Sequence, residues 1–558
     1  MQSEPNLPWY RELNRYHWFV LIVCTLGWLF DCLDQQLFNI SRAQAMRDLI
    51  PPDGNPDTWA GWATAMLLIG WATGGIVFGI MGDRVGRAKT MVWTILAYSV
   101  FTGLSAFSFS VWDFILYRFM TGLGVGGQFA VGVSLVAEVM PSRARPRALG
   151  ALQAFSAVGN ITAGMIGMGF SMLFLEEVVG SYWRWMFAIG VLPALLAVVV
   201  MARLQEPRQW QEQVAEKGKR GAGSLAEMFG TPQWRRRAIV GVILGSAGQI
   251  GLWAIGVFSN DLIGSIFRKD YQNQARAEGA AENDRLFVRT VLEHPEALTR
   301  AIDRFAEKTV LPRDLLGLQP GNKDPEALYA AAVALRKAGK DVSPAAVLDH
   351  LDRGNGAAAQ SSQDRVRREE YLAVPPPPAA EVGPLLDKIV ARHIHITGNV
   401  GIWTSVNLLL FNVGAFLGIY AFSIVTQSLG RRPTFAIFFV LAGACTVAAF
   451  AFLNDKSDIF WMTPIMGAAQ LSVFGGYAIY FPELFPTRMR ATGTSVCYNI
   501  ARYAAATGPV GTGFLTGYVF AHHAEPLRYA GAWMCLVYVL GLLVLPFAPE
   551  TKDQPLPE

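Results

Sequence analysis

Long apolar stretches recur along the whole chain and constrain its fold more than any other feature. A helix needs about 20 apolar residues to cross the hydrocarbon core of a bilayer. Outside residues 265–395 the chain is only about 12% charged, roughly half the fraction usual in soluble proteins. The pattern predicts an all-α membrane protein with twelve transmembrane helices. Their expected ranges are 17–39, 58–81, 88–108, 111–139, 147–174, 183–203, 238–260, 398–426, 433–453, 458–482, 492–520 and 528–548.

The short loops between these stretches differ in charge. Lys and Arg gather on one side, for example at Arg84, Arg143 and Arg488, and are few on the other. By the positive-inside rule both termini are expected to be cytoplasmic, in a multi-pass protein of the cytoplasmic (inner or plasma) membrane. The link 204–237 is expected on the same side, and the long polar segment 262–396 on the outside.

Composition also limits the partners. The net charge is +4, and no basic tract is interleaved with aromatic residues, so a nucleic-acid partner is not expected. The five cysteines lie in apolar stretches without CxxC or His/Cys metal spacing. We therefore expect no metal, no cofactor and no enzymatic activity. The polar first residues do not resemble a signal peptide.

The sequence repeats itself weakly. Gly86-Arg87 matches Gly430-Arg431 at an offset of 344, and E-x-x-P-[ST]-R-x-R occurs at 138–145 and, 345 residues later, at 483–490. Two six-helix halves with an insertion between helices 7 and 8 account for these offsets. The expected organisation is an N-terminal half, a cytoplasmic link, helix 7, an extracytoplasmic insertion, and helices 8–12 with a short tail. These parts cover 1–203, 204–237, 238–261, 262–396 and 397–558.

The insertion is expected to be a small helical domain. It holds equal numbers of acidic and basic residues, and a Pro stands at several expected helix starts, as in Ser343-Pro344. A run of prolines at 375–378 predicts a stiff extended linker. The insertion could bind a partner that the sequence does not identify. Its expected helices are 272–292, 295–308, 324–339, 344–353 and 379–394.

Several of these motifs resemble the major facilitator superfamily. The segment 82–89, GDRVGRAK, resembles the family's loop between helices two and three, and 118–127, RFMTGLGVGG, resembles its helix-four motif. Asp31-Cys32-Leu33-Asp34 is similar to a D-x-x-D in the aromatic-acid and sialate proton symporters. Segments 482–493 and 497–502 also resemble segments of these symporters. The resemblance covers about 425 residues, everything except the insertion. It implies the family's fold of two six-helix halves and a transport activity.

The chain also departs from the family pattern. Cys32 replaces the usual Gly, and Gln427 stands where the second loop motif would carry its acid. The second departure predicts an asymmetric cytoplasmic gate that is controlled mainly by the first half.

Two acids lie in the first apolar stretch. Asp31 and Asp34 share one helix face, where a carboxylate is costly and should face a cavity. A low dielectric and a neighbouring acid both favour the neutral carboxyl, so we predict a proton-coupling pair. The alternative is two acids that are simply solvated or ion-paired near the outer interface. The resemblance implies an energy-coupling role for Arg118, with Asp31 or Asp34 as its partner; the alternative is packing support.

Polar residues inside other stretches are candidates for substrate binding. Arg502 offers a planar fork suited to a carboxylate, or else a structural ion pair. Tyr498 and Asn499 lie within one turn of it. The further candidates are Gln128, Gln249 and Asn412, for which interhelical hydrogen bonds are the alternative.

The charged loops predict a cytoplasmic gate. Asp83, Arg84 and Arg87 are expected to join the two halves when the cytoplasmic side is closed, with glycines that permit the tight turn. The alternative is a solvated, positively charged turn. The expected gate residues are Gly82, Asp83, Arg84, Gly86, Arg87, Glu138, Arg143, Gly430, Arg431, Glu483 and Arg488.

These features and the resemblance together predict a secondary active transporter. It would take up a small organic anion, an aromatic or a sugar acid, with protons by alternating access. A sugar or polyol transporter and a facilitator remain alternatives, and a transporter-like receptor is a further one.

Overall fold

The computed structural model describes most of the chain, and the residues that it describes form helices and loops without a β-strand. The all-α prediction is confirmed for this part. The described residues are 9–49, 56–175, 183–192, 223–252, 257–277, 343–354, 378–506, 514–520, 522–523 and 525–557, with shorter pieces between 195 and 212 and between 286 and 375.

The first half of the chain begins with long helices that end at recognisable signals. Helix α4 starts with a capping box, in which Ser110 and Asp113 satisfy each other's backbone amides. Gly86 separates α2 from α3 at a φ of 124°, a left-handed conformation that favours glycine. The helices of this half are α1 (Arg15–Leu49), α2 (Pro56–Val85), α3 (Arg87–Ser105), α4 (Val111–Val139), α5 (Arg145–Ala154), α6 (Ser156–Leu175) and α7 (Trp183–Ile189).

The second half repeats the glycine break. Gly430 has a φ of 93° and separates α19 from α20, as Gly86 separates α2 from α3. The helices here are α11 (Pro232–Ile250), α12 (Val257–Ala277), α19 (Ala379–Leu429), α20 (Arg431–Phe452), α21 (Lys456–Glu483), α22 (Arg490–Ala506), α24 (Pro526–Met534) and α25 (Val537–Val544). The short α10 (Leu225–Gly230) lies in the link and α17 (Pro344–Gly354) in the insertion.

One expected helix boundary was wrong, and a second is not decided by the described residues. Helix 7 was expected over 238–260; α11 covers Pro232–Ile250, where the rings of Tyr477 and Tyr538 pack against Gly248 and Gly251, and α12 begins at Val257. Residues 253–256 lie outside the described part. The expected helices 379–394 and 398–426 are the single helix α19, because no helix-breaking residue separates them.

Some expectations fall partly outside the described residues. Expected helix 6 is described mainly as α7, and expected helix 11 continues past Ala506 into residues 507–513, which are not described. In the insertion, α17 begins at Pro344 as expected, and α12 reaches Ala277. The expected helices 295–308 and 324–339 lie almost wholly outside the described residues.

Seven helices in the described part of the chain are long and apolar enough to cross a membrane. The chain is therefore a multi-pass membrane protein. The seven segments are Arg15–Arg42, Trp59–Val85, Val111–Val139, Arg145–Leu173, Gly383–Leu429, Arg431–Phe452 and Pro526–Phe547.

The chain divides into two units. The first comprises Met1–Met168, Tyr182–Ile263 and Thr404–Glu558, and the second comprises Gly169–Ser181 and Gly264–Trp403. Within the second unit, the indole of Trp403 donates to the hydroxyl of Tyr271 at 3.0 Å and packs edge-on against Phe267. These contacts join the parts of α12 and α19 that belong to this unit.

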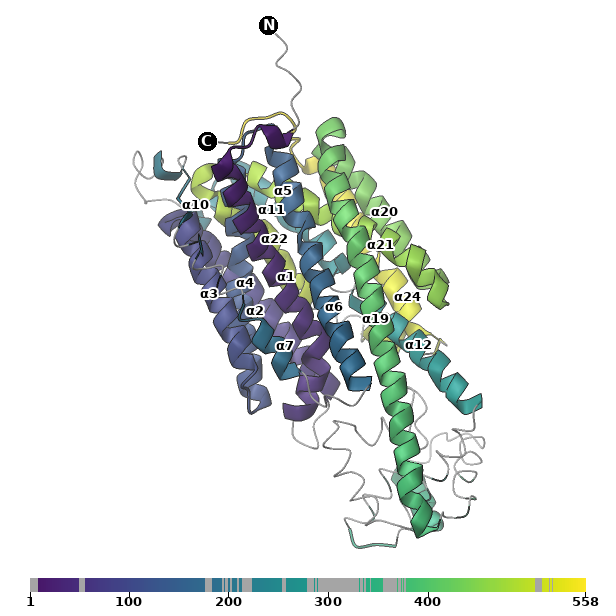
Figure 1. Ribbon diagram of the computed structural model, residues 1–558. Coiled ribbons are helices and arrows are strands. Elements are labelled where there is room, and N and C mark those ends of the chain that lie inside the picture. Colours follow the sequence, from purple (N-terminus) through teal and green to yellow (C-terminus); the bar gives the residue numbers. More distant parts are fainter. Residues whose placement is uncertain are drawn as a thin grey trace. The chain divides into compact units, whose positions relative to one another are not determined.

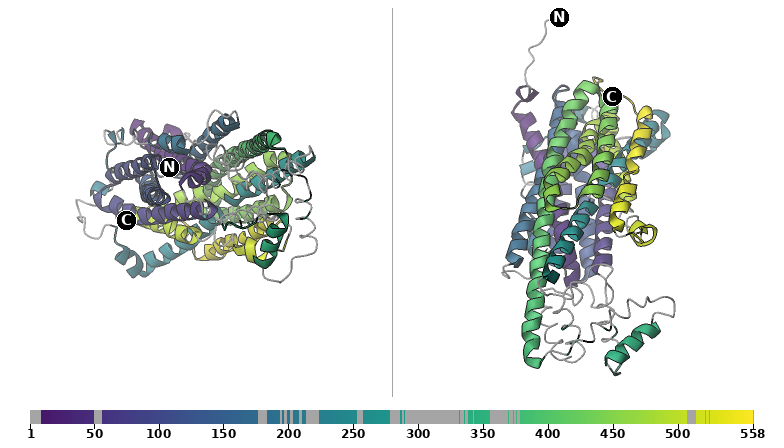
Figure 2. Two further views of the ribbon diagram at one scale, coloured as in Figure 1. Left: turned by 90° about the horizontal axis from the view of Figure 1, so that it is seen from below. Right: turned by 90° about the vertical axis from the view of Figure 1, so that its right-hand side faces the viewer.

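The helices of the first unit run side by side, and segments far apart in the sequence are neighbours, as with α4 and α22 (Figures 1 and 2). The turn Trp9–Arg11 and the residues after Ala548 lie at the same end of this unit. Glycines allow close packing: a Cβ at Gly126 of α4 would lie 2.5 Å from the backbone nitrogen of Gly75 in α2. The glycines of α4 therefore let it pack closely against α2.

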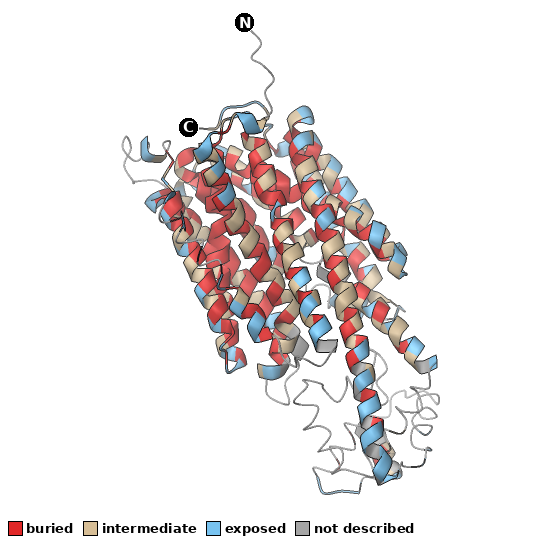
Figure 3. Ribbon diagram, in the orientation of Figure 1, coloured by how far each residue is buried: buried red, intermediate tan, exposed pale blue. Residues whose placement is uncertain are grey.

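In the first unit several large apolar side chains are exposed, and several charged side chains are buried. Trp93 and Phe452 are more than half exposed, whereas Asp31, Arg118 and Arg502 are buried. Figure 3 shows the buried faces turned toward neighbouring helices. Such burial indicates that the polar residues have partners or work inside the bundle.

Candidate functional site

Buried charges gather in two places in the first unit. One lies around Asp31, Asp34, Arg118 and Arg502, within the membrane-spanning helices. The other is the latch, which we define as Asp83, Arg87, Glu138, Arg490 and Thr492.

Asp31 and Asp34 lie on α1 and are almost completely buried, at 0% and 2% exposure. Both carboxylate oxygens of Asp31 and Oδ1 of Asp34 lack a hydrogen-bond partner. Asp31 interacts electrostatically with Arg502, and Asp34 with Arg118. An unsatisfied buried carboxylate is costly, so both acids are suited to gaining a proton or a ligand.

Arg118 of α4 is fully buried among aromatic rings. Its Nε and Nη2 donate to the Ser105 hydroxyl at 3.1 and 2.5 Å, and its Cζ lies 4.6 Å from the ring centroid of Phe187. Its Nη1 has no hydrogen-bond partner. The guanidinium is thus held in place on one side while one N–H edge stays available to an acid.

Arg502 of α22 lies against aromatic rings from both halves. Its Cζ is 3.4 Å from the ring centroid of Trp71 in α2 and 4.7 Å from that of Tyr498. Its Nε and Nη1 lack hydrogen-bond partners. A buried guanidinium with N–H groups that have no partner can receive a carboxylate.

Other substrate-binding candidates have partial partners. Gln128 accepts a hydrogen bond from Thr94 at 2.8 Å, and its Nε2 has no partner. Asn499 donates to Ser495 at 3.1 Å, and its Oδ1 has none. The ring of Tyr498 stacks on Phe129 of α4, with centroids 4.0 Å apart. All three side chains are buried, and Gln128 and Asn499 each have one polar atom without a hydrogen-bond partner.

The last two candidates differ sharply. Neither amide atom of Gln249, which is fully buried, has a hydrogen-bond partner. Asn412 accepts from Asn160 of α6 and donates to the Leu408 carbonyl, both at 2.8 Å. Gln249 lies within reach of the Tyr498 hydroxyl, whereas Asn412 links α19 to α6.

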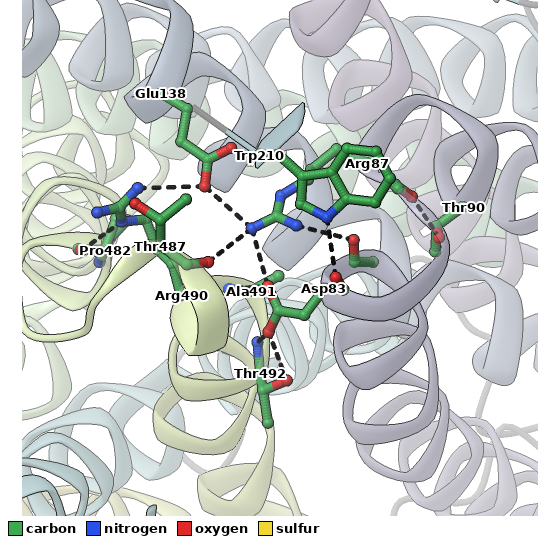
Figure 4. Close-up of polar contacts among 12 residues, drawn as sticks. Asp83, Arg87, Thr90, Glu138, Trp210, Pro482, Thr487, Arg490, Ala491 and Thr492 are labelled. Atoms are coloured by element: carbon green, nitrogen blue, oxygen red, sulfur yellow. Dashed lines mark hydrogen bonds and ion pairs between the residues drawn. The ribbon is translucent and has the colours of Figure 1, made fainter. Parts of the chain in front are cut away.

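The latch joins the two halves through Asp83 at the end of α2 (Figure 4). Its carboxylate accepts from the backbone amides of Ala491 and Thr492 at 3.3 and 2.9 Å and from the Thr492 hydroxyl at 2.6 Å. Asp83 is therefore bound to the start of α22 by three hydrogen bonds.

Arg87 and Arg490 share Glu138 within the latch (Figure 4). Their guanidinium nitrogens lie 3.0 and 3.1 Å from Oε1 of Glu138, and all three side chains are fully buried. Arg87 also pairs with Asp83 at 2.9 Å and donates to the Thr487 carbonyl of the second half at 2.8 Å. One glutamate therefore connects a cation from each half.

Two expected gate residues pair elsewhere. Arg143 forms a salt bridge with Glu12, and Arg488 forms one with Glu227 of the link. In these contacts they do not join the latch, whereas Arg490 of the repeated motif points to Glu138. Arg84 at the end of α2 is exposed. Gly82 lies beside Val131 and Ala491, and its carbonyl accepts from Arg87.

The second half holds its matching charges internally. Arg431 forms two hydrogen bonds with Glu483, at 2.7 and 3.1 Å. Gln427, which replaces the motif's acid, donates to the Ser423 carbonyl of its own helix at 3.0 Å. These contacts of Arg431 and Gln427 stay within the second half, whereas Asp83 of the first half binds residues of the second half.

Two glutamates cap matching helices. Glu206 accepts from the first backbone amides of α3, at Arg87, Ala88 and Lys89. Glu550 does the same for α20, at Arg431 and Arg432. The two acids are 344 residues apart, the offset of the Gly-Arg repeat.

These caps place a negative charge at a helix N-terminus, where it is favourable. For Glu550, burial raises the pKa, but the backbone amides of Arg431, Arg432 and Lys552 outweigh it and bring the pKa below its ordinary value.

Five contributing residues were not expected from the sequence. The indole of Trp210 donates to the Asp83 carbonyl at 2.9 Å, and Trp71 stacks on Arg502. Two of them had a signal in the sequence. Arg490 is the second arginine of the repeated motif, and Glu206 recurs as Glu550 at the offset of the repeat. Thr492 and the two tryptophans carried no sequence signal. The residues are Trp71, Glu206, Trp210, Arg490 and Thr492.

Comparison with known proteins identifies the family of both halves. Residues 24–267 match the Major Facilitator Superfamily profile, and residues 394–558 match the Sugar (and other) transporter profile. A Haemophilus influenzae protein named as a putative metabolite transport protein is 24% identical to this chain. The alignment covers 98% of this chain and 99% of that protein.

Two relatives with named substrates match over shorter regions. The niacin transporter of Acinetobacter baylyi and the sialic acid transporter of Escherichia coli are each 32% identical. The alignments cover 36% and 37% of this chain, and 42% and 48% of those proteins. This chain therefore matches less than half the length of each.

The fold has a counterpart among solved structures. The structure of a proton:xylose symporter aligns with a TM-score of 0.54 at 15% identity, covering 97% of this chain and 98% of that one. This likeness concerns the fold alone. The profile matches, together with the motifs and the membrane helices, lead to one conclusion. The chain is a membrane transporter, not an enzyme, and it belongs to the major facilitator superfamily.

Proposed function

We propose that the protein is a secondary active transporter that takes up a small organic anion together with protons. The observation that carries the proposal is the buried, unsatisfied carboxylate of Asp31, which interacts electrostatically with Arg502, a buried arginine whose Nε and Nη1 have no hydrogen-bond partner. Niacin and sialic acid, named for two relatives, are both carboxylic acids. A substrate carboxylate at Arg502 would compete with Asp31 for its positive charge, and protonation of Asp31 would relieve that competition.

In this proposal the buried polar residues have different roles in proton coupling and substrate binding. Asp31 would exchange protons next to the substrate, and Asp34 with Arg118 would form the neighbouring relay on α1 and α4. Gln128, Gln249, Tyr498 and Asn499 would complete the binding site around Arg502. Asn412 would contribute indirectly, by holding α19 against α6.

The proposed topology has twelve spans with both termini and the link 204–237 in the cytoplasm, in the inner or plasma membrane. The insertion 262–396 would lie outside, where it could bind a partner. The placement of both chain ends at one end of the first unit supports an even number of spans. In this arrangement the latch is cytoplasmic and closed, and transport requires it to open.

Proteoliposomes loaded with unlabelled substrate test the proposal. Counterflow of a labelled organic anion should occur without a gradient, and net uptake should rise with an inward proton gradient and collapse with an uncoupler. Uptake that ignores the gradient would make the protein a facilitator. The Sugar (and other) transporter profile favours a neutral sugar or polyol as the second candidate. Counterflow of a sugar but of no anion would select it.

Counterflow also separates transport from sensing. A transporter-like receptor would bind its ligand without counterflow of any anion or sugar.

A further inference from the structure

One face of α3 carries a row of buried hydroxyl groups. Tyr98, Thr102 and Ser105 follow one another at spacings of four and three residues, so they lie on one face of the helix. All three are fully buried, and neither Oη of Tyr98 nor Oγ1 of Thr102 has a hydrogen-bond partner. Buried polar groups usually have partners, so two unsatisfied hydroxyl groups one turn apart indicate a functional role. We call these three residues the hydroxyl row.

Helices α1 and α3 run in the same direction. Glu12, which precedes α1, forms a salt bridge with Arg143, which follows α4. Arg87 at the start of α3 binds Glu138 near the end of α4. Both helices therefore begin beside the same end of α4, and residues equally far along them lie at similar depths.

Gln128 of α4 shows the register between the two helices. It accepts a hydrogen bond from Thr94 of α3 at 2.8 Å, and a Cβ built on Gly27 of α1 would collide with its amide nitrogen. Thr94 and Gly27 therefore flank the same side chain. One turn further along each helix, Tyr98 of α3 is level with Asp31 of α1.

The next turn brings Thr102 to Asp34. A Cβ built on Gly190, which follows α7, would touch both the Thr102 methyl group and Oδ1 of Asp34, so these two side chains lie side by side. Tyr98 interacts electrostatically with Asp34 as well as with Asp31. The hydroxyl row therefore follows α1 from one acid to the other.

Each acid also has an arginine near it. Arg118 of α4 interacts electrostatically with Asp34. Arg502 of α22 interacts with Asp31, and so does the neighbouring thiol of Cys32. The two arginines come from different halves of the chain, so the hydroxyl row connects an acid that faces a first-half cation with one that faces a second-half cation.

We propose that the hydroxyl groups of Thr102 and Tyr98 relay the coupling proton from Asp34 to Asp31. This inference rests on the proposed function and deepens it. A hydroxyl group both donates and accepts, so it can take up one proton while it releases another. Asp34 gives its proton to the Thr102 oxygen, the Thr102 proton passes to the Tyr98 oxygen, and the Tyr98 proton passes to the Asp31 carboxylate. Three O–H bonds break and three form, and the net change is that Asp34 becomes charged and Asp31 neutral.

The two arginines set the direction of the relay. Arg118 stabilises the carboxylate that Asp34 becomes, because an opposite charge nearby favours the charged form. Arg502 stabilises the carboxylate of Asp31 in the same way, but a substrate anion at Arg502 neutralises this effect. Binding of the anion therefore favours proton transfer toward Asp31, which couples the proton to the substrate.

Variants that remove only a hydroxyl group test the relay. Tyr98→Phe keeps the ring, and Thr102→Val keeps the shape of the threonine side chain. Proteoliposomes are assayed with labelled nicotinate, benzoate or N-acetylneuraminate, whichever shows counterflow with the wild type. We expect uptake driven by a proton gradient to fall at least about tenfold in both variants, because a positioned acid–base group contributes at least that much to a proton transfer. Counterflow requires no net proton movement and should stay near the wild-type rate.

Thr102→Ser and Tyr117→Phe are the matched controls. Thr102→Ser retains the hydroxyl group, and Tyr117 lies on α4, where its ring packs against Phe101. Both should keep gradient-driven uptake near the wild-type rate. Pyranine inside the proteoliposomes gives a second readout, because proton entry after addition of the anion should slow in Tyr98→Phe and Thr102→Val as much as uptake does.

Two kinds of result would overturn the inference. Gradient-driven uptake at the wild-type rate in Tyr98→Phe or Thr102→Val would exclude that hydroxyl group from the relay. An equal loss of uptake and counterflow, or a loss in Thr102→Ser as large as in Thr102→Val, would show a structural role instead. If Tyr98→Phe does not fold, the two Thr102 variants still decide.

Failure of the proposed function is a separate outcome. It would appear in the wild type, as absence of counterflow for all three anions or as uptake that does not respond to the proton gradient.

Discussion

The carboxylate of Asp83 accepts two hydrogen bonds from Thr492, 409 residues later in the chain, from its backbone amide at 2.9 Å and its hydroxyl at 2.6 Å. This contact ties the end of α2 to the start of α22. Hydrogen bonds to a charged group contribute about 1.5–3 kcal/mol each. Asp83 therefore stabilises the conformation in which these two helix ends are together.

Asp83→Asn should weaken this contact, because a neutral amide is a poorer acceptor than a carboxylate. We expect counterflow to slow at least tenfold while expression and substrate affinity stay nearly unchanged. Gln427→Ala is the matched control, since Gln427 occupies the equivalent position but donates to its own helix. A folded Asp83→Asn variant with full activity would remove the gating role.

Asp31→Asn should uncouple transport from the proton gradient. The amide cannot exchange a proton, and it removes the negative charge beside Arg502. We expect counterflow to persist while uptake driven by a proton gradient falls to the level seen with an uncoupler. Both assays use the same proteoliposomes, so counterflow controls for folding and insertion. Gradient-driven uptake that survives in this variant would exclude Asp31 as the coupling acid.

Glu138→Gln should destabilise the protein strongly, because it leaves Arg87 and Arg490 buried without their shared counter-charge. Breaking a buried pair costs about 3–5 kcal/mol. Glu227→Gln is the comparison, because its pair with Arg488 is about one-third exposed and should contribute only about 0–1 kcal/mol. Thermal unfolding in detergent should rank Glu138→Gln well below Glu227→Gln, and similar Tm values would contradict the role given to Glu138.

Glu550 should make a pH-dependent contribution to stability. Because its pKa lies below the ordinary value, the charged cap stabilises the fold above that ordinary value, and the stabilisation is lost as pH falls through the lowered pKa. Glu550→Gln should lower Tm at pH 7 and match the wild type near pH 3. A difference between the two that does not change from pH 7 to pH 3 would mean that the charge of Glu550 is not the stabilising feature.

Removal of the insertion tests whether it is modular. The deletion should span 278–378 and be closed by a short Gly/Ser linker, so that α12 and α19 keep their bounds and Tyr271 keeps its contact with Trp403. We expect a folded, correctly inserted protein that retains counterflow, because the proposed site and the latch lie in the first unit. Loss of counterflow at every substrate concentration, in a well-expressed variant, would place the insertion in the transport cycle.

Patterns that depend only on neighbours along the chain were readable from the sequence. The apolar stretches predicted an all-α membrane protein because crossing a bilayer requires a minimum helix length. The Gly86 and Gly430 motifs predicted tight breaks because few other residues adopt those backbone angles. The family followed from the loop and helix-four motifs, which are local as well. Helix ends without such signals, as in α11 and α19, were placed less accurately.

Only the tertiary structure determined which buried side chains pair with one another. Arg488 and Arg490 lie in the same repeated motif, and the sequence favoured Arg488 as the gate residue, but the fold directs Arg490 to Glu138 and Arg488 to Glu227. No pattern in the sequence indicated that Trp71 of α2 meets Arg502 of α22, since nothing local distinguishes this tryptophan from one facing lipid. The physical reason is that the packing of helices far apart in the sequence determines which buried charges and rings come into contact. One turn of helix separates a residue that faces the interior from one that faces the bilayer.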